Sequence, residues 1–526
     1  MLVSKKDRIC FLSVFILLSS AAVAQTTSIK ITIPEHNVKI DPMLYGQMLE
    51  NVNDSMIYRG VVDSAGNERL PVTNLLKDLD IPVMRWPGGT VIHEYRWRNG
   101  IGPKFLRPSV QTYAWKGPEN YQFGTDEFLQ WCRRIGTTPY INFNMGNSIE
   151  YGGTLWEALE WMEYTNGTAN TPMGKLRASN GHPEPYNVKY WCIGNENYGP
   201  WGRHTAEKDT AYARRLEVWS GTIKNVFPKV SLLAIGHTLK WNREVLAKNG
   251  KYIDFLTQHY YVTSKLKDGV VQNPYSTLFA PAKMEAHLKM LGRQLDTVNQ
   301  VLGRTDTPIR LSVDEWNNRH SVFNNSTYRF SRQSPRQLLD AALVATMLNV
   351  FIRQSPTVGM ANYIFPVNAH GLVRTVGNHD AFVTPPYYVF QQYRRWMTGR
   401  KLDIGIEGPG ITPAVARPTI EGDTEEIQMG DETLTFIDAA SVLNDDGNIC
   451  VSLVNRSVDV SQKVVLTLPT GFKAVKKWTL AHKNIHAINT PDNRNAITPT
   501  MRTINNKSKT FTLILDPCSV VLLNFF

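Results

Sequence analysis

The sequence predicts an α/β protein in which a (β/α)8 TIM barrel is followed by a C-terminal antiparallel β-sandwich domain. From about residue 41 to residue 390, short apolar runs alternate with amphipathic stretches of helical length, the pattern of a parallel sheet covered by helices. The apolar runs are eight in number, as a closed barrel requires. An open, doubly wound sheet remains the alternative, because periodicity does not show whether a sheet closes. After about residue 401 the runs become short and alternating, which is typical of antiparallel sheets.

The eight barrel strands are expected where apolar runs are bounded by polar or turn residues. They lie at residues 43–49, 81–86, 138–145, 188–194, 231–236, 255–261, 309–313 and 360–365. Amphipathic helices are expected between them, for example at 125–132, 206–226, 282–302 and 334–352. In the first of these helices Thr125 is the expected N-cap, and Gly136 is expected to follow the helix end.

The two ends of the chain predict a leader peptide and a second domain. Residues 1–24 combine a basic start, an apolar run and a small-residue ending, which describe a signal peptide and an exported protein, periplasmic or extracellular. Residues 25–40 are expected to contain a strand that joins the β-sandwich. The barrel is expected over residues 41–395 and the C-terminal sandwich over residues 396–526.

Composition and charge exclude several classes of protein. With 42% hydrophobic and 20% charged residues in 526, the composition is globular rather than disordered or fibrous. The formal net charge is +11, but the basic residues do not cluster, so we expect solvated surface charges and no nucleic-acid partner. Beyond the leader, no apolar run approaches the roughly 18 residues of a membrane span, so no membrane partner is expected.

The cysteines predict no metal site. Cys132, Cys192, Cys450 and Cys518 are far apart in the chain and lack the histidine spacing of a zinc centre. Neither a metal nor another cofactor is expected. Cys450 and Cys518 lie in strand-like segments and could pair in an oxidising compartment, or all four could be buried as free thiols.

Two glutamates follow predicted barrel strands, where catalytic groups of such barrels collect. Glu196 follows the fourth strand and Glu315 follows the seventh, each next to Asn and aromatic residues. Aromatic rings beside carboxylates suit a sugar, whose faces are apolar and whose rim carries hydroxyls. Two carboxylates facing each other across a barrel mouth are the equipment of glycoside hydrolysis. A pair of buried, salt-bridged structural acids is the alternative.

Four motifs together resemble those of a known family. They are Arg85-Trp86-Pro87-Gly88-Gly89, Gly100-Ile101-Gly102-Pro103, Gly194-Asn195-Glu196-Asn197-Tyr198-Gly199-Pro200-Trp201 and Asp314-Glu315-Trp316-Asn317. In content, order and strand placement they are similar to the motifs of the α-L-arabinofuranosidases of glycoside hydrolase family 51. The resemblance covers most of the chain. It implies a retaining enzyme that releases terminal non-reducing α-L-arabinofuranosyl residues from plant cell-wall polysaccharides or oligosaccharides, without a cofactor.

The resemblance also implies residue roles. Glu196 would be the acid/base and Glu315 the nucleophile of a double displacement. The remaining expected site residues would orient the nucleophile or contact the sugar. These are His259 and Tyr261 beside Glu315, Asn195 at the hydroxyl next to the reacting carbon, Glu50 at distal hydroxyls, and Thr90 and Trp316 as further substrate-binding residues. Arg85 is expected as an ion-pair partner without a catalytic role.

Two positions depart from the family pattern and leave alternatives open. Thr90 stands where the family usually has Asn, and Thr384 lies where it tends to carry a sugar-contacting Gln. Both changes concern non-reacting hydroxyls, so the reaction class is better supported than the sugar. The alternatives are an endo-β-1,4-glucanase or xylanase, another furanosidase on the same barrel, and a glycan-binding protein without catalysis. A homo-oligomer is possible.

Overall fold

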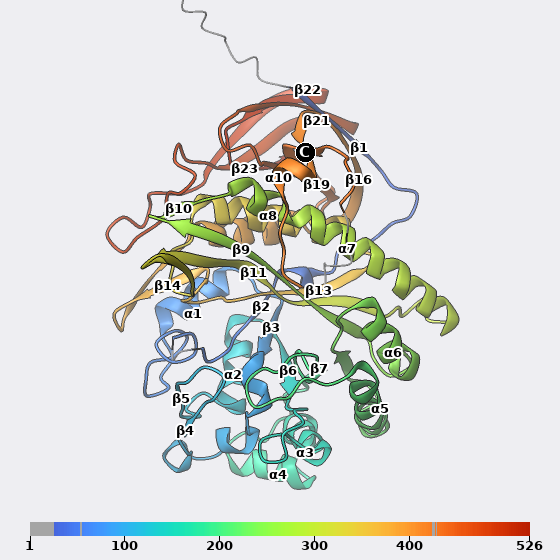
Figure 1. Ribbon diagram of the computed structural model, residues 1–526, viewed down its shortest axis with the longest axis vertical. Coiled ribbons are helices and arrows are strands. Elements are labelled where there is room, and N and C mark those ends of the chain that lie inside the picture. The colour runs from blue at the N-terminus through green and yellow to red at the C-terminus, as the bar shows by residue number, and fades with distance from the viewer. Residues whose placement is uncertain (1–25, 53–54, 423–426, 428) are drawn as a thin grey trace, which may run out of the picture.

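The computed structural model describes residues 26–52, 55–422, 427 and 429–526. The signal peptide expected at residues 1–24 lies outside the described residues. The described chain forms a barrel with a smaller sheet domain at one end (Figure 1). None of the described helices combines the length and the apolar character needed to cross a membrane.

Eight parallel strands close into a barrel. They are β2 (Gly46–Met48), β3 (Val83–Trp86), β6 (Thr138–Phe143), β7 (Tyr190–Ile193), β8 (Ser231–Ala234), β9 (Phe255–Lys267), β11 (Arg310–Asn324) and β13 (Val358–Tyr363). Each pairs with the next, and β13 pairs with β2, so the ring has no open edge. The closed ring confirms the barrel and excludes the open sheet.

The observed strands overlap all eight expected ones but differ in length. The first is short, because Pro42–Tyr45 form a 3-10 helix, η1, capped by Asp41. By contrast, β9 and β11 continue well past the barrel rim, because their ladder extends to the pair Leu266 and Val322. Each extension then forms a hairpin, with β10 (Val270–Val271) and β12 (Thr327–Ser331) respectively. These arms rise beside the carboxyl ends of the strands.

Helices cover the outside of the barrel. They are α1 (Leu70–Asp78), α2 (Thr125–Ile135), α3 (Leu155–Asn166), α4 (Pro172–Ser179), α5 (Asp209–Val226), α6 (Leu239–Asn249), α7 (Pro274–Val301), α8 (Leu338–Arg353) and α9 (Pro385–Trp396). The N-cap of α2 is Gly124 and not Thr125, because Glu127 accepts a hydrogen bond from the Gly124 N–H at 2.9 Å. Gly136 does follow the end of α2, with φ 80°.

A seven-stranded sheet forms the C-terminal domain. Its strands are β1 (Thr26–Thr32), β16 (Arg400–Glu407), β19 (Ile437–Leu443), β20 (Ile449–Asn455), β21 (Gln462–Leu480), β22 (Thr500–Leu515) and β23 (Val520–Phe525). The N-terminal strand β1 pairs antiparallel with β16 and parallel with β21, so the sheet curls back on itself. Its inner face encloses a separate apolar core that includes Ile29, Leu453 and Leu466.

The outer face of this sheet packs on the barrel helix α8, which lies between the two domains (Figure 1), and also on α9. Asn349 of α8 donates to Asp438 of β19 at 2.8 Å, and Arg353 pairs with the same carboxylate at 3.1 Å. Tyr393 of α9 hydrogen-bonds Ser452 of β20. Charged and polar contacts therefore fix the orientation of the sheet on the barrel.

Short elements occupy the loops. They are η2 (Thr90–His93), η3 (Trp97–Gly100), η4 (Lys104–Leu106), β4 (Val110–Gln111), β5 (Pro118–Glu119), β14 (Val373–Val376), β15 (Asp380–Val383), β17 (Gly410–Ile411), α10 (Pro413–Ala416) and β18 (Leu434–Thr435).

The possible disulfide between Cys450 and Cys518 is not formed. Cys132, Cys192, Cys450 and Cys518 are all buried free thiols. Cys450 lies near the start of β20, whereas the Cys518 N–H donates to Ser457, beyond the other end of that strand, at 2.8 Å. The two side chains are therefore at opposite ends of β20 and cannot reach each other.

Candidate active site

Glu196 lies on a tight turn directly after β7. Gly194 (φ 98°) and Glu196 (φ 44°) both adopt left-handed backbone conformations. A Cβ at position 194 would lie only 2.2 Å from Asn197 Oδ1, so this position requires glycine. Asn197 closes the turn, since its Oδ1 accepts from the Asn195 N–H at 3.1 Å and its Nδ2 donates to Met145 at 3.0 Å. The left-handed Glu196 costs on the order of 1 kcal/mol, which these hydrogen bonds offset.

Two stacked histidines support the same turn from behind. Their ring centres lie 4.5 Å apart. His93 Nε2 donates to the Asn195 carbonyl at 2.8 Å, and His204 Nε2 donates to the Asn197 carbonyl at 3.0 Å. Burial, with the nearby His204, lowers the pKa of His93 to about 3. His93 is therefore a neutral donor, and the carbonyl groups of both neighbours of Glu196, Asn195 and Asn197, are held.

Glu315 lies at an irregularity in β11. Opposite β9, Val313 pairs with Gln258 and Glu315 pairs with His259, so Asp314 is an extra residue in the ladder. Such a bulge redirects side chains. Both Asp314 and Glu315 consequently contact Arg85 inside the barrel, at 3.5 and 2.7 Å. The orientation of the Glu315 side chain toward the barrel interior thus depends on one inserted residue, Asp314.

A histidine bridges the two glutamates. His259 Nδ1 lies 2.8 Å from Glu196 Oε1 and 3.7 Å from Glu315 Oε2. This nitrogen and one carboxylate oxygen of each glutamate all lie within 4.8 Å of one another. Retaining glycosidases place their carboxyl groups about 5 to 5.5 Å apart, so the separation suits a nucleophile rather than an activated water.

His259 and Tyr261 form hydrogen bonds to different glutamates. Tyr261 donates its hydroxyl to Glu315 Oε2, in the orienting position that the sequence suggests. His259 was expected to orient Glu315 as well, but its hydrogen bond goes to Glu196. The reason is that Tyr261 and Arg85 already bind the Glu315 oxygens, which leaves His259 at ion-pair distance only.

The charges around Glu315 keep it ionised. Burial opposes its ionisation, but the positive charges of His259 and Arg85 and the hydrogen bonds from Tyr261 and Arg85 lower its pKa to about 2. Burial likewise opposes the charged form of His259, yet the carboxylates of Glu315 and Glu196 raise its pKa. Glu315 is therefore a carboxylate throughout the neutral range, as attack on carbon requires.

Arg85 connects the catalytic residues. It is fully buried on β3, with Nη1 on Glu315 at 2.7 Å and Nη2 on Asn195 Oδ1 at 2.6 Å. Because Asn195 receives this bond through its oxygen, its buried Nδ2 stays without a partner among the described residues. That amide is a donor available to a sugar hydroxyl. Glu196, His259 and Glu315 could also ligate a cation, but the guanidinium already supplies positive charge at Glu315.

Glu50 is buried beside the site and tends to be neutral. It follows β2, and its Oε1 accepts from Trp115 Nε1 at 3.0 Å and from the Val91 N–H at 3.2 Å. Burial and the Glu315 charge raise its pKa to about 7. Below that pH it carries a proton that it can donate, which suits contact with a hydroxyl.

A cavity of about 570 Å³ opens at the carboxyl ends of the strands. Its walls include Glu196, His259, Tyr261 and Thr90, so the structure places Thr90 where the sequence suggests. Gly89, just before Thr90, must lack a side chain, since a Cβ there would lie 2.5 Å from Glu315 Oε1.

Trp316 and Thr384 do not take the positions that we expected. Trp316 is fully buried on the outer side of β11, where its ring packs edge-on against Phe351 of α8 and near Phe390 of α9. Strand alternation past the bulge turns Trp316 outward when Glu315 points inward. Thr384, just before α9, donates its hydroxyl to the carbonyls of Gly371 and Leu372. Neither therefore contacts the sugar.

Several residues of the cavity wall are not predicted by the sequence. They come from loops and arms, and include Trp115, Tyr198, Trp201, Arg319, Arg332 and Glu421. Glu421 reaches the site from beyond α10 through a backbone pair with Tyr261, although we assigned that part of the chain to the β-sandwich. No periodic signal marks such loop residues; of the six, Tyr198 and Trp201 lie within one of the motifs quoted above.

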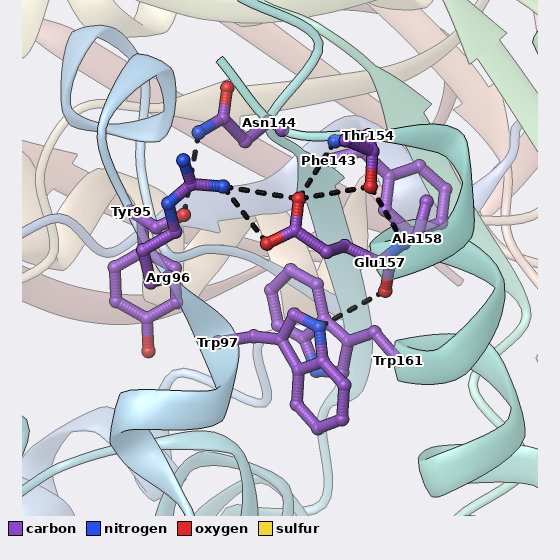
Figure 2. Close-up of a pocket in the computed structure, with 10 residues that line it drawn as sticks. Tyr95, Arg96, Trp97, Phe143, Asn144, Thr154, Glu157, Ala158 and Trp161 are labelled. Atoms are coloured by element: carbon purple, nitrogen blue, oxygen red, sulfur yellow. Dashed lines mark hydrogen bonds and ion pairs between the residues drawn. The ribbon is translucent and has the colours of Figure 1, made fainter. Parts of the chain in front are cut away.

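A second, much smaller cavity of about 20 Å³ is structural. Figure 2 shows Arg96 bound to the Glu157 carboxylate, with oxygens at 2.9 and 3.1 Å. Glu157 also accepts from the backbone of Thr154, the N-cap of α3, and Trp97 donates to the Glu157 carbonyl. These groups satisfy one another, so this pocket anchors the start of α3.

The fold and site together define a retaining glycoside hydrolase, with two glutamates at the ends of the fourth and seventh barrel strands. Two family models match the chain, the α-L-arabinofuranosidase 1 domain over residues 75–277 and the α-L-arabinofuranosidase C-terminal domain over residues 314–519. The chain belongs to the α-L-arabinofuranosidases of glycoside hydrolase family 51.

Relatives match over most of the chain. α-L-Arabinofuranosidase C of Emericella nidulans is 32% identical, covering 82% of this chain and 85% of that protein. An intracellular exo-α-L-arabinofuranosidase of Bacteroides ovatus is 29% identical, covering 86% of each. Among solved structures, the thermostable GH51 α-L-arabinofuranosidase of Thermotoga petrophila superposes with a TM-score of 0.77 at 28% identity, covering 95% of this chain and all of that one.

Proposed function

We propose that the protein is an exo-acting, retaining α-L-arabinofuranosidase that releases terminal non-reducing arabinofuranosyl residues from plant cell-wall polysaccharides or oligosaccharides. The observation that carries the proposal is the approach of Glu196 and Glu315 to within 4.8 Å, with Glu315 held ionised. The names of the relatives support the choice of sugar. The glucanase or xylanase alternative is not favoured, since the relatives that match most of the chain are arabinofuranosidases.

The reaction proceeds in two displacements at the anomeric carbon. Glu315 attacks that carbon while Glu196 gives its proton to the departing glycosidic oxygen, so a glycosyl ester forms on Glu315. Glu196 then takes a proton from water, and the resulting nucleophile displaces Glu315. Two inversions retain the configuration. Glu196 can change roles because the charge of Glu315 is absent from the ester.

The surrounding residues position the sugar and the nucleophile. Tyr261 and Arg85 hold the Glu315 oxygens, and the free Nδ2 of Asn195 is suited to the hydroxyl beside the reacting carbon. Glu50 offers a protonated carboxyl to a more distant hydroxyl.

Glu315→Gln tests the proposal. With 4-nitrophenyl α-L-arabinofuranoside we expect turnover to fall on the order of 10³-fold or more, whereas Glu217→Gln, an exposed replacement on α5, should leave it unchanged. The first sugar released should have the α configuration by NMR. An unchanged rate in Glu315→Gln, a β first product, or hydrolysis of only the β-xyloside or β-galactofuranoside would overturn the proposal.

Export and assembly also belong to the proposal. A signal peptide at residues 1–24 would place the enzyme in the periplasm or outside the cell, next to polymeric substrate. N-terminal sequencing of the secreted protein should begin at Gln25. A homo-oligomer would appear in light scattering as a multiple of the monomer mass.

A further inference from the structure

An arginine lies on the wall of the active-site cavity against two aromatic rings. Arg332, directly after β12, places its Cζ 4.4 Å from the centre of the Trp115 ring and 4.6 Å from that of Phe330. All three residues line the same cavity as Glu196. The Trp115 ring is itself fixed by its hydrogen bond to Glu50. Stacking uses the face of the guanidinium, so its N–H groups stay available at the edge.

No carboxylate among the described residues contacts Arg332 directly, and Glu50 acts on its charge only from a distance. Its guanidinium forms no hydrogen bond or ion pair with any of them, although it is half-buried. The neighbouring Arg319 differs, because it pairs with Glu421 at 3.2 Å and stacks on Tyr261. Burial lowers the pKa of Arg332, and the charge of Arg319 lowers it further, while Glu50 acts in the opposite sense. An anion entering the cavity would thus meet an oriented, partly desolvated cation.

Arg332 lines the cavity that a glycan attached to the arabinofuranose must enter and leave. Glu196 protonates the glycosidic oxygen, so the rest of the glycan must leave past Glu196 into the remaining cavity. A cavity of about 570 Å³ lies in the range that encloses a drug-sized ligand, so it has room for more than one sugar ring. The Trp115 ring offers an apolar surface for such a ring, and the edge of Arg332 offers paired donors.

We propose that Arg332 binds the carboxylate of a uronic acid residue in the glycan that carries the arabinofuranose, so that the enzyme prefers acidic substrates. This inference rests on the proposed function and adds the substrate class. A planar guanidinium matches a carboxylate with two parallel hydrogen bonds, which a neutral CH2OH group cannot accept in the same way.

The test uses two substrates that differ only in this group. One is an arabinofuranosyl oligosaccharide with a hexuronic acid next to the arabinofuranose, and the other is the same compound with its carboxyl reduced to CH2OH. We expect kcat/KM to favour the acidic substrate about 10-fold or more at low salt, and the preference to shrink as salt is added. Arg332→Gln should reduce this ratio to near 1, and Arg332→Lys should retain part of it.

A matched control is Arg329→Gln, which removes the same charge from an exposed position on β12 and should preserve the ratio. A ratio near 1 in the unmodified enzyme, or a ratio that Arg332→Gln leaves intact, would overturn the inference. Hydrolysis of 4-nitrophenyl α-L-arabinofuranoside separates the two proposals. If this substrate is cleaved without any acidic preference, only the role of Arg332 fails; if it is not cleaved at all, the proposed function fails.

Discussion

Replacing Tyr261 with Phe removes the hydroxyl that donates to Glu315 and leaves the ring in place under Arg319. A hydrogen bond to a charged group contributes about 1.5 to 3 kcal/mol, and 1.36 kcal/mol corresponds to one pKa unit. His259, Arg85 and this hydroxyl lower the pKa of Glu315 to about 2, although burial raises it. Removing the hydroxyl should therefore raise this pKa by about 1 to 2 pH units. Because only ionised Glu315 attacks, the acidic limb of activity should move to higher pH by the same amount.

The assay is kcat/KM for 4-nitrophenyl α-L-arabinofuranoside from about pH 2 to pH 8, which reports groups of the free enzyme. Near pH 6 Glu315 is ionised in both enzymes, so the remaining loss, about 10-fold, measures orientation. Tyr260→Phe is the control, since its hydroxyl faces His287 on the other side of β9. An acidic limb that stays in place in Tyr261→Phe, together with full activity at pH 6, would refute the reasoning.

Two further predictions follow from burial. Burial and the Glu315 charge raise the pKa of Glu50 from 4.5 to about 7, so the folded state binds this proton more tightly than the unfolded state does. The free energy of unfolding should therefore fall by up to about 3 kcal/mol as the pH rises from 4.5 through 7. Glu50→Gln should lack this loss, so its unfolding free energy relative to the unmodified enzyme should rise from pH 5 to pH 8; a constant difference would contradict the assignment. Trp316→Ala should lower the free energy of unfolding by about 3 to 5 kcal/mol in chemical denaturation and leave KM for the nitrophenyl glycoside nearly unchanged. Trp115→Ala, in contrast, should raise KM. The reverse pattern would show that Trp316 contacts the sugar.

Local sequence patterns determined the barrel and the catalytic pair. The alternation of apolar runs and amphipathic stretches located all eight strands, because each strand must bury its residues whatever its neighbours are. Glu196 and Glu315 could then be paired from opposite parts of the chain, since the carboxyl ends of parallel strands share one face of a barrel. Asn195, Tyr261 and Thr90 were placed by motif resemblance and lie at the site.

Only the tertiary structure decided how the side chains meet. The extra residue at Asp314 turns Glu315 inward and Trp316 outward, and a one-residue irregularity leaves no trace in hydrophobic periodicity. The hydrogen bond between His259 and Glu196 and the approach of Arg332 and Glu421 to the cavity join segments far apart in the sequence. Likewise, only the strand pairing places Cys450 and Cys518 at opposite ends of β20. Such contacts depend on how complete elements pack in space, which no local pattern encodes.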